Sequence, residues 1–253
     1  MADRLLSPLE SDGGTLELTR AWSIGWIAAL AVSLHLTAAT AGETETIFTD
    51  HFDRPDAETV GNDWSSKGSV ILKNKAAHFA ANEEEFRPRM KHRFPVQEEG
   101  KFTVSFRMDW LRESEGTWGF YMQLGNSEEI PKRLVYLDDL WKGIGVNLVW
   151  GGGELVNHEK AGSLGYLKGG QFKPLVVIND NRVKSSVVEK AVVTIEVDLD
   201  SNSFRLSVGG KTYNDLPLDN EGPIDTIRFI TNGCSASGFR KSSIDNVLVT
   251  RQK

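Results

Sequence analysis

Hydrophobic and polar residues alternate along most of the chain after residue 42. The segment 101–110 is the clearest example, because large apolar side chains occupy every second position: Phe102, Val104, Phe106, Met108 and Trp110. Successive side chains of a strand point to opposite faces of the sheet, so this period of two predicts a strand with one buried face. Related patterns predict further strands at 117–126, 143–150, 191–199, 203–210, 225–233 and 242–250.

Short stretches rich in Gly, Asn and Ser separate these segments, as turns do. Helical periodicity is almost absent after residue 42, and many short strands joined by such turns are typical of sandwiches. We therefore predict an all-β fold, a two-sheet antiparallel β-sandwich (jelly roll), built from a single domain at 42–253. The segment 154–190 is the least regular, and we expect long loops there around one or two strands.

The N-terminal part has the character of an export signal. Residues 21–41 carry no charged side chain and end in the small-x-small sequence Ala39-Thr40-Ala41. This combination predicts a signal peptide at 1–41, which would make the protein secreted, periplasmic or attached to the cell surface. The alternative is an uncleaved signal anchor, because the apolar run at 21–41 is long enough to span a bilayer.

The net charge and the cysteine content limit which binding partners and which disulfides we expect. A formal net charge of −6 over 253 residues leaves no general basic field, so nucleic acid is not an expected partner. Cys234 is the only cysteine, and an exported domain with one cysteine has no internal disulfide. We expect a monomer that has no membrane contact beyond its export signal.

The order of these segments resembles a known superfamily. The opening FTDHFDRPDAETVGNDW, the hairpin VTIEVDLDSNSFRLSVGG, the segment PIDTIRFITNG and the final SSIDNVLV are similar to the concanavalin A-like lectin/glucanase superfamily in its laminin-G-like form, of the exported bacterial type. The resemblance implies a jelly roll of about fourteen strands. It also implies that the outer face of a concave sheet, with its loops, holds a sugar. Enzymes, lectins and adhesion modules share this fold, so the resemblance alone does not decide the function.

A row of three carboxylates raises the question of catalysis. Glu196, Asp198 and Asp200 alternate along one predicted strand, and a retaining glycosidase uses one carboxylate as nucleophile and another as proton donor. The laminarinase/lichenase glycosidases of this superfamily carry the pattern E-x-D-x-x-E or E-x-D-x-E, and Asp200 stands where they have Glu. Because 200–203 is a strong turn sequence, we expect a hairpin with Glu196 and Asp198 facing water. Both stay weak catalytic candidates.

Basic residues alternate in the segment FRPRMKHRF, at Arg87, Arg89, Lys91 and Arg93. Guanidinium groups pair bidentately with carboxylate or sulfate, so Arg87 and Arg89 are candidate ligands for acidic glycans. The alternative is an edge strand that is protected by its charges and by Pro88.

Polar side chains on the non-core faces of the middle strands form a second candidate surface. Its members combine planar polar groups with an aromatic ring: Ser105, Arg107, Asp109, Tyr121, Gln123 and Asn147. Such a mixture suits sugar hydroxyls and sugar C–H faces, although the solvated side of any sheet is also polar. Trp141, in a predicted loop, is the candidate for an exposed stacking ring.

Two further hypotheses remain open, a polysaccharide lyase site and a structural calcium site. YLKGGQF from Tyr166 resembles the Y-x-K-x-G segment of alginate-type polysaccharide lyases, with His158 as a second candidate base, but their Gln-x-His motif is absent. Asp50, Asp53 and Asp245 lie near the two ends of the chain and could hold a structural Ca²⁺, or simply cap turns.

These observations favour an exported domain that binds extracellular polysaccharide without cleaving it and needs no cofactor, with the structural Ca²⁺ kept as an option. A glycosidase or lyase on the same scaffold and a protein-binding adhesion module are the alternatives.

Overall fold

The computed structural model describes residues 43–80, 87–111, 119–130, 144–151, 163–176, 190–219, 221–231 and 241–253. The chain divides into two units, Met1–Thr40 and Ala41–Lys253, and every described residue belongs to the second. Within the described residues, no helix is long and apolar enough to cross a membrane. The predicted signal peptide at 1–41 lies outside the described residues.

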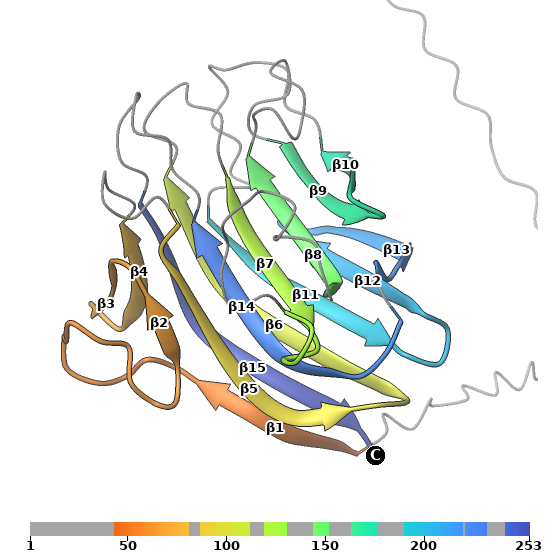
Figure 1. Ribbon diagram of the computed structural model, residues 1–253, viewed down its shortest axis with the longest axis horizontal. Coiled ribbons are helices and arrows are strands. Elements are labelled where there is room, and N and C mark those ends of the chain that lie inside the picture. Colours follow the sequence, from red (N-terminus) through yellow and green to blue (C-terminus); the bar gives the residue numbers. More distant parts are fainter. Residues whose placement is uncertain are drawn as a thin grey trace, which may run out of the picture. The chain divides into compact units, whose positions relative to one another are not determined.

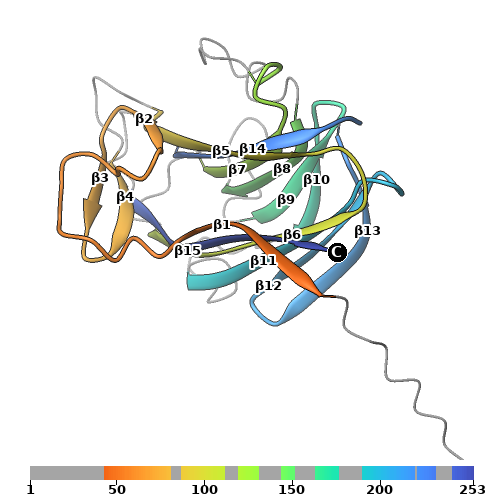
Figure 2. The ribbon, with the colours of Figure 1, turned by 90° about the horizontal axis from the view of Figure 1, so that it is seen from below.

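The described residues form fifteen strands in two antiparallel sheets that pack face to face (Figures 1 and 2). The predicted all-β sandwich is thus confirmed. The eight-stranded sheet has the order β13-β12-β11-β6-β15-β4-β3, and β1 also pairs with β15. Its strands are β1 (Thr44–Asp50), β3 (Val70–Lys73), β4 (Ala76–Ala80), β6 (Lys101–Leu111), β11 (Lys190–Asp198), β12 (Ser203–Val208), β13 (Lys211–Pro217) and β15 (Lys241–Gln252).

The seven-stranded sheet has the order β10-β9-β8-β7-β14-β5-β2. Its strands are β2 (Ser65–Lys67), β5 (Arg89–Gln97), β7 (Phe120–Gly125), β8 (Ile144–Gly151), β9 (Ser163–Lys168), β10 (Gln171–Val176) and β14 (Ile224–Thr231). Its central strands β7 and β14 are buried along their whole length, so both of their faces are covered.

Alternation places the predicted apolar residues in the core between the sheets. On β11, Val193, Ile195 and Val197 are buried, as predicted. The turn after β11 also forms where the sequence predicts it: the carboxylate of Asp200 accepts a hydrogen bond from the amide of Gly100, 2.9 Å away. Gly100 has a φ of +74°, which glycine adopts without strain.

An aromatic cluster joins the two sheets at their centre. Phe106 on β6 meets Phe229 on β14 edge to face, with ring centroids 5.0 Å apart, and Trp150 on β8 at 6.4 Å. Phe120 on β7 contacts both Trp150 and Phe229. All four side chains are buried. Because one ring comes from the eight-stranded sheet and three come from the seven-stranded sheet, the cluster fixes how the two layers face each other.

The buried carboxylate of Asp50 stabilises the loop that connects β1 of the eight-stranded sheet to β2 of the seven-stranded sheet. Asp50 ends β1 and accepts hydrogen bonds from both terminal nitrogens of Arg54 (2.7 and 2.9 Å), from Trp64 Nε1 (2.8 Å) and from the amide of Phe52 (2.7 Å). Burial alone would raise the pKa of Asp50, but these bonds and one from Asn62 outweigh it and lower the pKa below its ordinary value. The carboxylate therefore stays ionised inside the protein.

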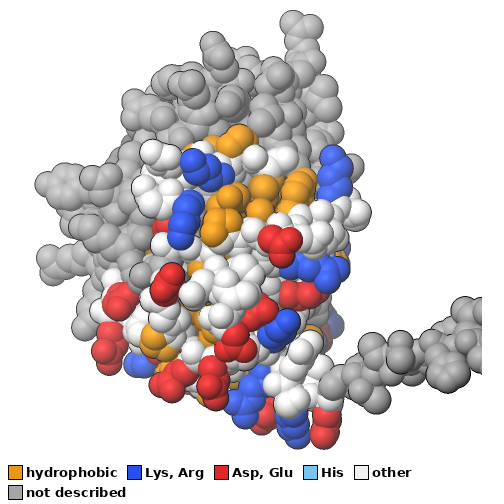
Figure 3. Space-filling model, turned by 90° about the vertical axis from the view of Figure 1, so that its right-hand side faces the viewer, with side chains coloured by type: hydrophobic (Ala, Val, Ile, Leu, Met, Phe, Trp, Pro, Cys, Tyr) orange, Lys and Arg blue, Asp and Glu red, His pale blue; other side chains and the backbone are white. Residues whose placement is uncertain are grey.

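β10 is an edge strand of the seven-stranded sheet, and β13 is an edge strand of the eight-stranded sheet. The two edges lie on the same side of the sandwich (Figure 1). The ammonium group of Lys168 donates to the carbonyl of Leu218, and the amide of Gly169 donates to Asp219, so contacts tie the two edges together. Hydrophobic side chains gather on this side next to Lys and Arg side chains (Figure 3). Pro174 interrupts β10 at a register shift, a feature that discourages pairing with further strands.

Removal of the central ring tests the role of the aromatic cluster. Phe106→Ala should lower the free energy of unfolding by about 3–5 kcal/mol, because it deletes a fully buried ring and leaves a cavity. Val192→Ala is the control, because Val192 is 64% exposed, and it should change stability by no more than about 0.5 kcal/mol. Urea denaturation measures both, and equal losses would contradict the assigned packing.

A buried histidine makes stability depend on pH. His92 is 8% exposed and stacks on Phe48 with ring centroids 3.7 Å apart. Burial lowers the pKa of His92, against the opposing effect of the carboxylates of Asp63 and Asp50. The neutral ring therefore contributes stability in full above the unfolded pKa of about 6.5, and that contribution is lost as the pH falls toward the folded value.

Urea denaturation between pH 7.5 and pH 5 should thus show declining stability for the unmodified protein. His92→Phe keeps an aromatic ring against Phe48 but cannot be protonated, so its stability should decline less over this range. Identical slopes for the two proteins would show that His92 is not the responsible group.

Candidate functional site

A row of polar side chains crosses the outer face of the seven-stranded sheet. Lys91 on β5 lies directly opposite Arg228 on β14, which lies opposite Gln123 on β7, which lies opposite Asn147 on β8. The neighbours of these residues along each strand point into the core, so the row itself faces outward. The structure thus brings together three residues that the sequence analysis singled out and adds Arg228, which it did not.

Arg228 is a buried cation. Its side chain is only 2% exposed, and its Nε donates to Gln123 Oε1 over 2.7 Å. Burial, together with the positive charge of Arg89, lowers the pKa of Arg228 to about 9. The guanidinium is still protonated at neutral pH, so the fold holds a positive charge at this position, oriented by the amide of Gln123.

The predicted polar face is not a solvated surface. Gln123 is 0% and Asn147 1% exposed. Beside them lies a second apolar cluster on the outer side of the sheet, formed by Tyr121, Val149, Leu167 and Ile230 with Phe172 packed against it. Tyr121, Gln123 and Asn147 lie on the non-core face, as predicted, but the alternative of a merely solvated face is wrong for them, because this sheet buries side chains on both faces of its central strands. Gln123 orients Arg228 from this buried position through its hydrogen bond.

Toward the β2 edge of the same face there is a cavity of about 310 Å³. It lies over β2, β5 and β14 and is lined by Ser65, Ser66, Lys67, Arg89, Met90, Lys91 and Arg228. We call it the basic cavity. Strand pairing places Lys67 opposite Arg89 and Lys91 opposite Arg228. Four basic side chains thus line this cavity, and Arg89, Lys91 and Arg228 each also interact with other parts of the chain.

The other basic residues of this stretch, Arg87 and Arg93, are not among the residues that line the cavity. Arg93 is committed to an ion pair with Asp225 at 2.9 Å, and Asp225 also accepts from the hydroxyl and amide of Ser127. The half-buried Arg87 precedes β5, and its carbonyl accepts a hydrogen bond from Arg89. The alternative of an edge strand is wrong, because β5 pairs with β14 on one side and β2 on the other.

Arg107 does not join this surface. It lies on β6 in the eight-stranded sheet, opposite Val192 and Asp245, whereas Tyr121 and Gln123 lie on β7 in the other sheet. The sequence prediction that these residues share one face is wrong, since alternation shows which residues of a strand share a face but not which strands share a sheet.

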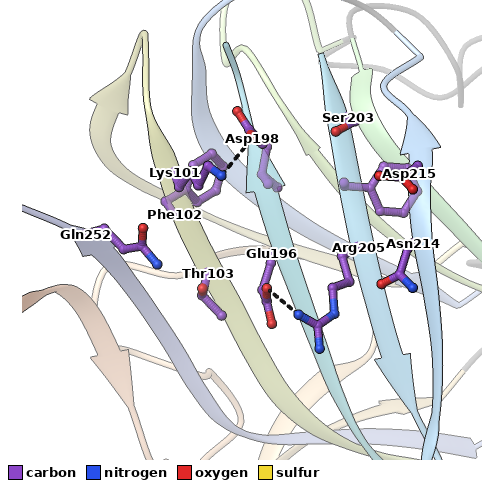
Figure 4. Close-up of a pocket in the computed structure, with 12 residues that line it drawn as sticks. Lys101, Phe102, Thr103, Glu196, Asp198, Ser203, Arg205, Asn214, Asp215 and Gln252 are labelled. Atoms are coloured by element: carbon purple, nitrogen blue, oxygen red, sulfur yellow. Dashed lines mark hydrogen bonds and ion pairs between the residues drawn. The ribbon is translucent and has the colours of Figure 1, made fainter. Parts of the chain in front are cut away.

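The carboxylate strand occupies the outer face of the eight-stranded sheet. Glu196 pairs with Arg205 at 3.2 Å and Asp198 with Lys101 at 3.1 Å (Figure 4). They line an open groove of about 370 Å³ together with Thr103, Ser203, Asn214, Asp215 and other residues. The hydrogen bond from Lys101 lowers the pKa of Asp198, whereas a glycosidase needs one carboxyl group with a raised pKa as its proton donor. As expected, both side chains face water as members of ion pairs.

The three acidic residues that were considered for Ca²⁺ have other partners. Asp50 is saturated by Arg54 and its neighbours, and Asp53 pairs with Lys75 at 2.9 Å. Asp245 accepts hydrogen bonds from the amide and side chain of Asn246, while burial raises its pKa. In the part of the chain that the structure describes, no three or more His, Cys, Asp or Glu side chains are grouped to hold a metal ion. The structure thus gives the calcium prediction no support.

The remaining candidates are an exposed tryptophan and two lyase bases. Tyr166 on β9 packs its ring against the core, edge to face with Phe204 at 5.8 Å, and so faces away from the outer surface of its sheet. Trp141 and His158 lie outside the described residues.

Arg228, Lys67 and Ser65 are the site residues that the sequence analysis missed. A signal for Arg228 was present, because Arg228 takes a polar position between Ile227 and Phe229 in an alternating segment. Ser65 and Lys67 belong to a strand of only three residues, which is too short to show a period.

The sequence matches no protein-family model and no curated protein. Solved structures, by contrast, are similar in fold. The carbohydrate recognition domain of Emp47p has a TM-score of 0.54 and 15% identity, covering 82% of this chain and 95% of that domain. The seed lectin of Lotus tetragonolobus has a TM-score of 0.55 and 12% identity, covering 82% of this chain and 99% of the lectin.

A sialidase is also similar, with a TM-score of 0.55 and 10% identity over 79% of this chain, which spans only 18% of the sialidase. At such low identities the likeness concerns the fold. Two antiparallel sheets in this arrangement, similar to lectins over most of their length, show that the chain has the concanavalin A-like lectin/glucanase fold.

Proposed function

We propose that this domain binds acidic polysaccharide outside the cell, without cleaving it, and that the basic cavity is where it binds. The observation that carries the proposal is the convergence of Lys67, Arg89, Lys91 and Arg228 from three strands on one cavity. Several proteins of similar fold are lectins or, in one case, a carbohydrate recognition domain, and this likeness supports a role in sugar binding.

The geometry suggests a role for each part of the site. Arg89 can pair with an acidic group of the glycan through two parallel hydrogen bonds, and Lys91 and Lys67 add point charges beside it. Gln123 accepts the hydrogen bond from Arg228 Nε and so holds the guanidinium in place beside the cavity. Trp141 stays a predicted stacking ring, and Arg87 a predicted contact at the margin of the cavity.

The location and the ion pairs of Glu196 and Asp198 support binding without catalysis. Glu196 and Asp198 lie on the opposite sheet from the basic cavity, and both are engaged in ion pairs. A glycan bound over β5 and β14 would therefore not meet them. Secretion through the signal peptide at 1–41 belongs to the same proposal, since it would place the domain among extracellular polysaccharides.

Charge reversal in the cavity tests the proposal. Arg89→Glu should weaken retention on acidic polysaccharides by about tenfold or more, because a charge-assisted hydrogen bond is replaced by repulsion. Lys211→Glu makes the same change in net charge on β13 of the other sheet and should leave retention unchanged. The difference between the two variants should shrink at about 1 M salt, where charges are screened within about 3 Å.

The same incubations should be assayed for new reducing ends and for the absorbance of unsaturated sugars. Retention without product is the expected result. Product formation would make the domain an enzyme, and equal retention of the two variants would reject the basic cavity as the binding site.

A further inference from the structure

We propose that the outer face of the eight-stranded sheet carries a second binding site, for an uncharged polysaccharide chain. This site lies on the opposite sheet from the basic cavity and takes a different class of ligand, so it goes beyond the proposed function. The domain would then hold a neutral glycan on one sheet and an acidic glycan on the other.

The groove around Glu196 and Asp198 continues beyond these two residues. Its volume of about 370 Å³ adjoins a second hollow of about 480 Å³, formed by residues 96–101 and 251–253, and Lys101 and Gln252 line both. We call the two together the polar groove. The lining of the first hollow comes from five adjacent strands, which lie about 4.8 Å apart, so it crosses roughly 19 Å of the sheet. A groove of this length suits a chain of sugars better than a single ring.

Opposite charges are nearly balanced in the polar groove. Among the described residues, each of its four basic side chains belongs to an ion pair, with N–O distances of 2.9–3.4 Å: Lys101–Asp198, Arg205–Glu196, Arg251–Glu45 and Lys253–Glu43. A charged ligand would have to displace one member of such a pair. The hydroxyl groups of an uncharged sugar both donate and accept hydrogen bonds, so they can bind beside an ion pair without breaking it. The charges therefore favour a neutral ligand.

Three polar side chains of the groove are available to such a ligand. Asn214, Asp215 and Gln252 are exposed and form no hydrogen bond or ion pair with another described side chain. Gln252 lies on one side of the two central ion pairs, and Asn214 and Asp215 lie on the other (Figure 4). An amide offers two donors and an acceptor, and a carboxylate offers two acceptor oxygens. Together they match the adjacent hydroxyl groups of sugar rings, which need both donors and acceptors.

A β-bulge in β13 brings two of these side chains to the groove. The pairing of β12 with β13 shifts register between Phe204 and Leu206, so Asn214 and Asp215 together oppose Arg205. Consecutive residues of a regular strand face opposite sides, yet both Asn214 and Asp215 line the groove. Asp215 has a φ of +54°, a conformation that costs energy for residues other than glycine. Bulges often redirect side chains beside functional sites, so this irregularity supports a binding role for the groove.

The groove also offers apolar surface to the C–H faces of sugar rings. Val96 lines the second hollow and is 48% exposed. The side chains of Lys101 and Arg205 are aliphatic up to their charged ends, and both line the first hollow. A sugar chain in the groove would thus meet hydrogen-bonding groups and aliphatic surface along the same path.

Calorimetric titration of the purified protein with uncharged oligosaccharides tests the inference. The probes are cellohexaose, xylohexaose, mannohexaose and maltohexaose. We expect at least one to bind, with a dissociation constant that changes less than about twofold between roughly 0.1 M and 1 M salt, because screening acts on charges and the ligand has none. Failure of all four to bind, or binding that weakens strongly at high salt, would overturn the site.

Matched glutamine variants locate the binding. Gln252→Ala should weaken binding of the same oligosaccharide by about fivefold, because hydrogen bonds at the junction of the two hollows are lost. Gln171→Ala removes another exposed glutamine, at the start of β10 in the other sheet, and should leave binding unchanged. Both side chains are exposed, so neither change should disturb folding. Equal binding by the two variants would overturn the assignment to the polar groove.

The two proposals fail in different ways. Retention on acidic polysaccharides, without binding of any neutral hexasaccharide, would keep the proposed function and reject the polar groove. Neutral binding that is weakened in Gln252→Ala, without retention on acidic polysaccharides, would keep the polar groove and reject the proposed function. Loss of acidic retention in Gln252→Ala would show that the polar groove takes charged glycans and would overturn its assignment to a neutral ligand.

Discussion

The arrangement of the two sheets depends on the aromatic cluster in which Phe106 contacts Trp150 and Phe229, and Phe120 contacts the same two rings. Phe106 belongs to the eight-stranded sheet and the other rings to three neighbouring strands of the seven-stranded sheet. Since successive residues of a strand face opposite sides of the sheet, the inward direction of these rings determines which residues point outward. With a single cysteine in the chain, this apolar packing holds the layers together without an internal disulfide.

The inward packing of Phe229 places the buried cation Arg228 on the outer face of the sheet. Phe229 faces the core, so Arg228 faces the other side of β14, where Lys91 and Gln123 flank it. A buried guanidinium beside further cations is costly, and natural proteins often accept such local costs at functional sites. The hydrogen bond to Gln123 offsets part of that cost and orients the group. The same packing that stabilises the sandwich thus creates the basic cavity, whereas the ion-paired carboxylates on the other sheet form a neutralised surface.

Much of the fold could be predicted from the sequence, because a local period reports local structure. The strands β6, β8 and β11 and the turn at Asp200 follow from alternation and turn residues alone. Pairing of strands far apart in the chain could not be predicted in this way. Arg107 and Tyr121 occupy similar polar positions but belong to different sheets, and Arg228 meets Lys91 across more than a hundred intervening residues. The three-residue β2, which contributes Lys67, has no period to detect.

The central claim is that acidic glycans bind on the outer face of the seven-stranded sheet at the β2 edge. Backbone amide shifts in an NMR titration with a sulfated oligosaccharide test this most directly, because they locate the contact without any substitution. The account predicts that the largest shifts occur in β2, β5 and β14 and that β11 and β12 stay unchanged. Shifts that concentrate around Glu196 and Asp198 instead would contradict the account and would indicate that the ligand binds at the carboxylate strand, β11.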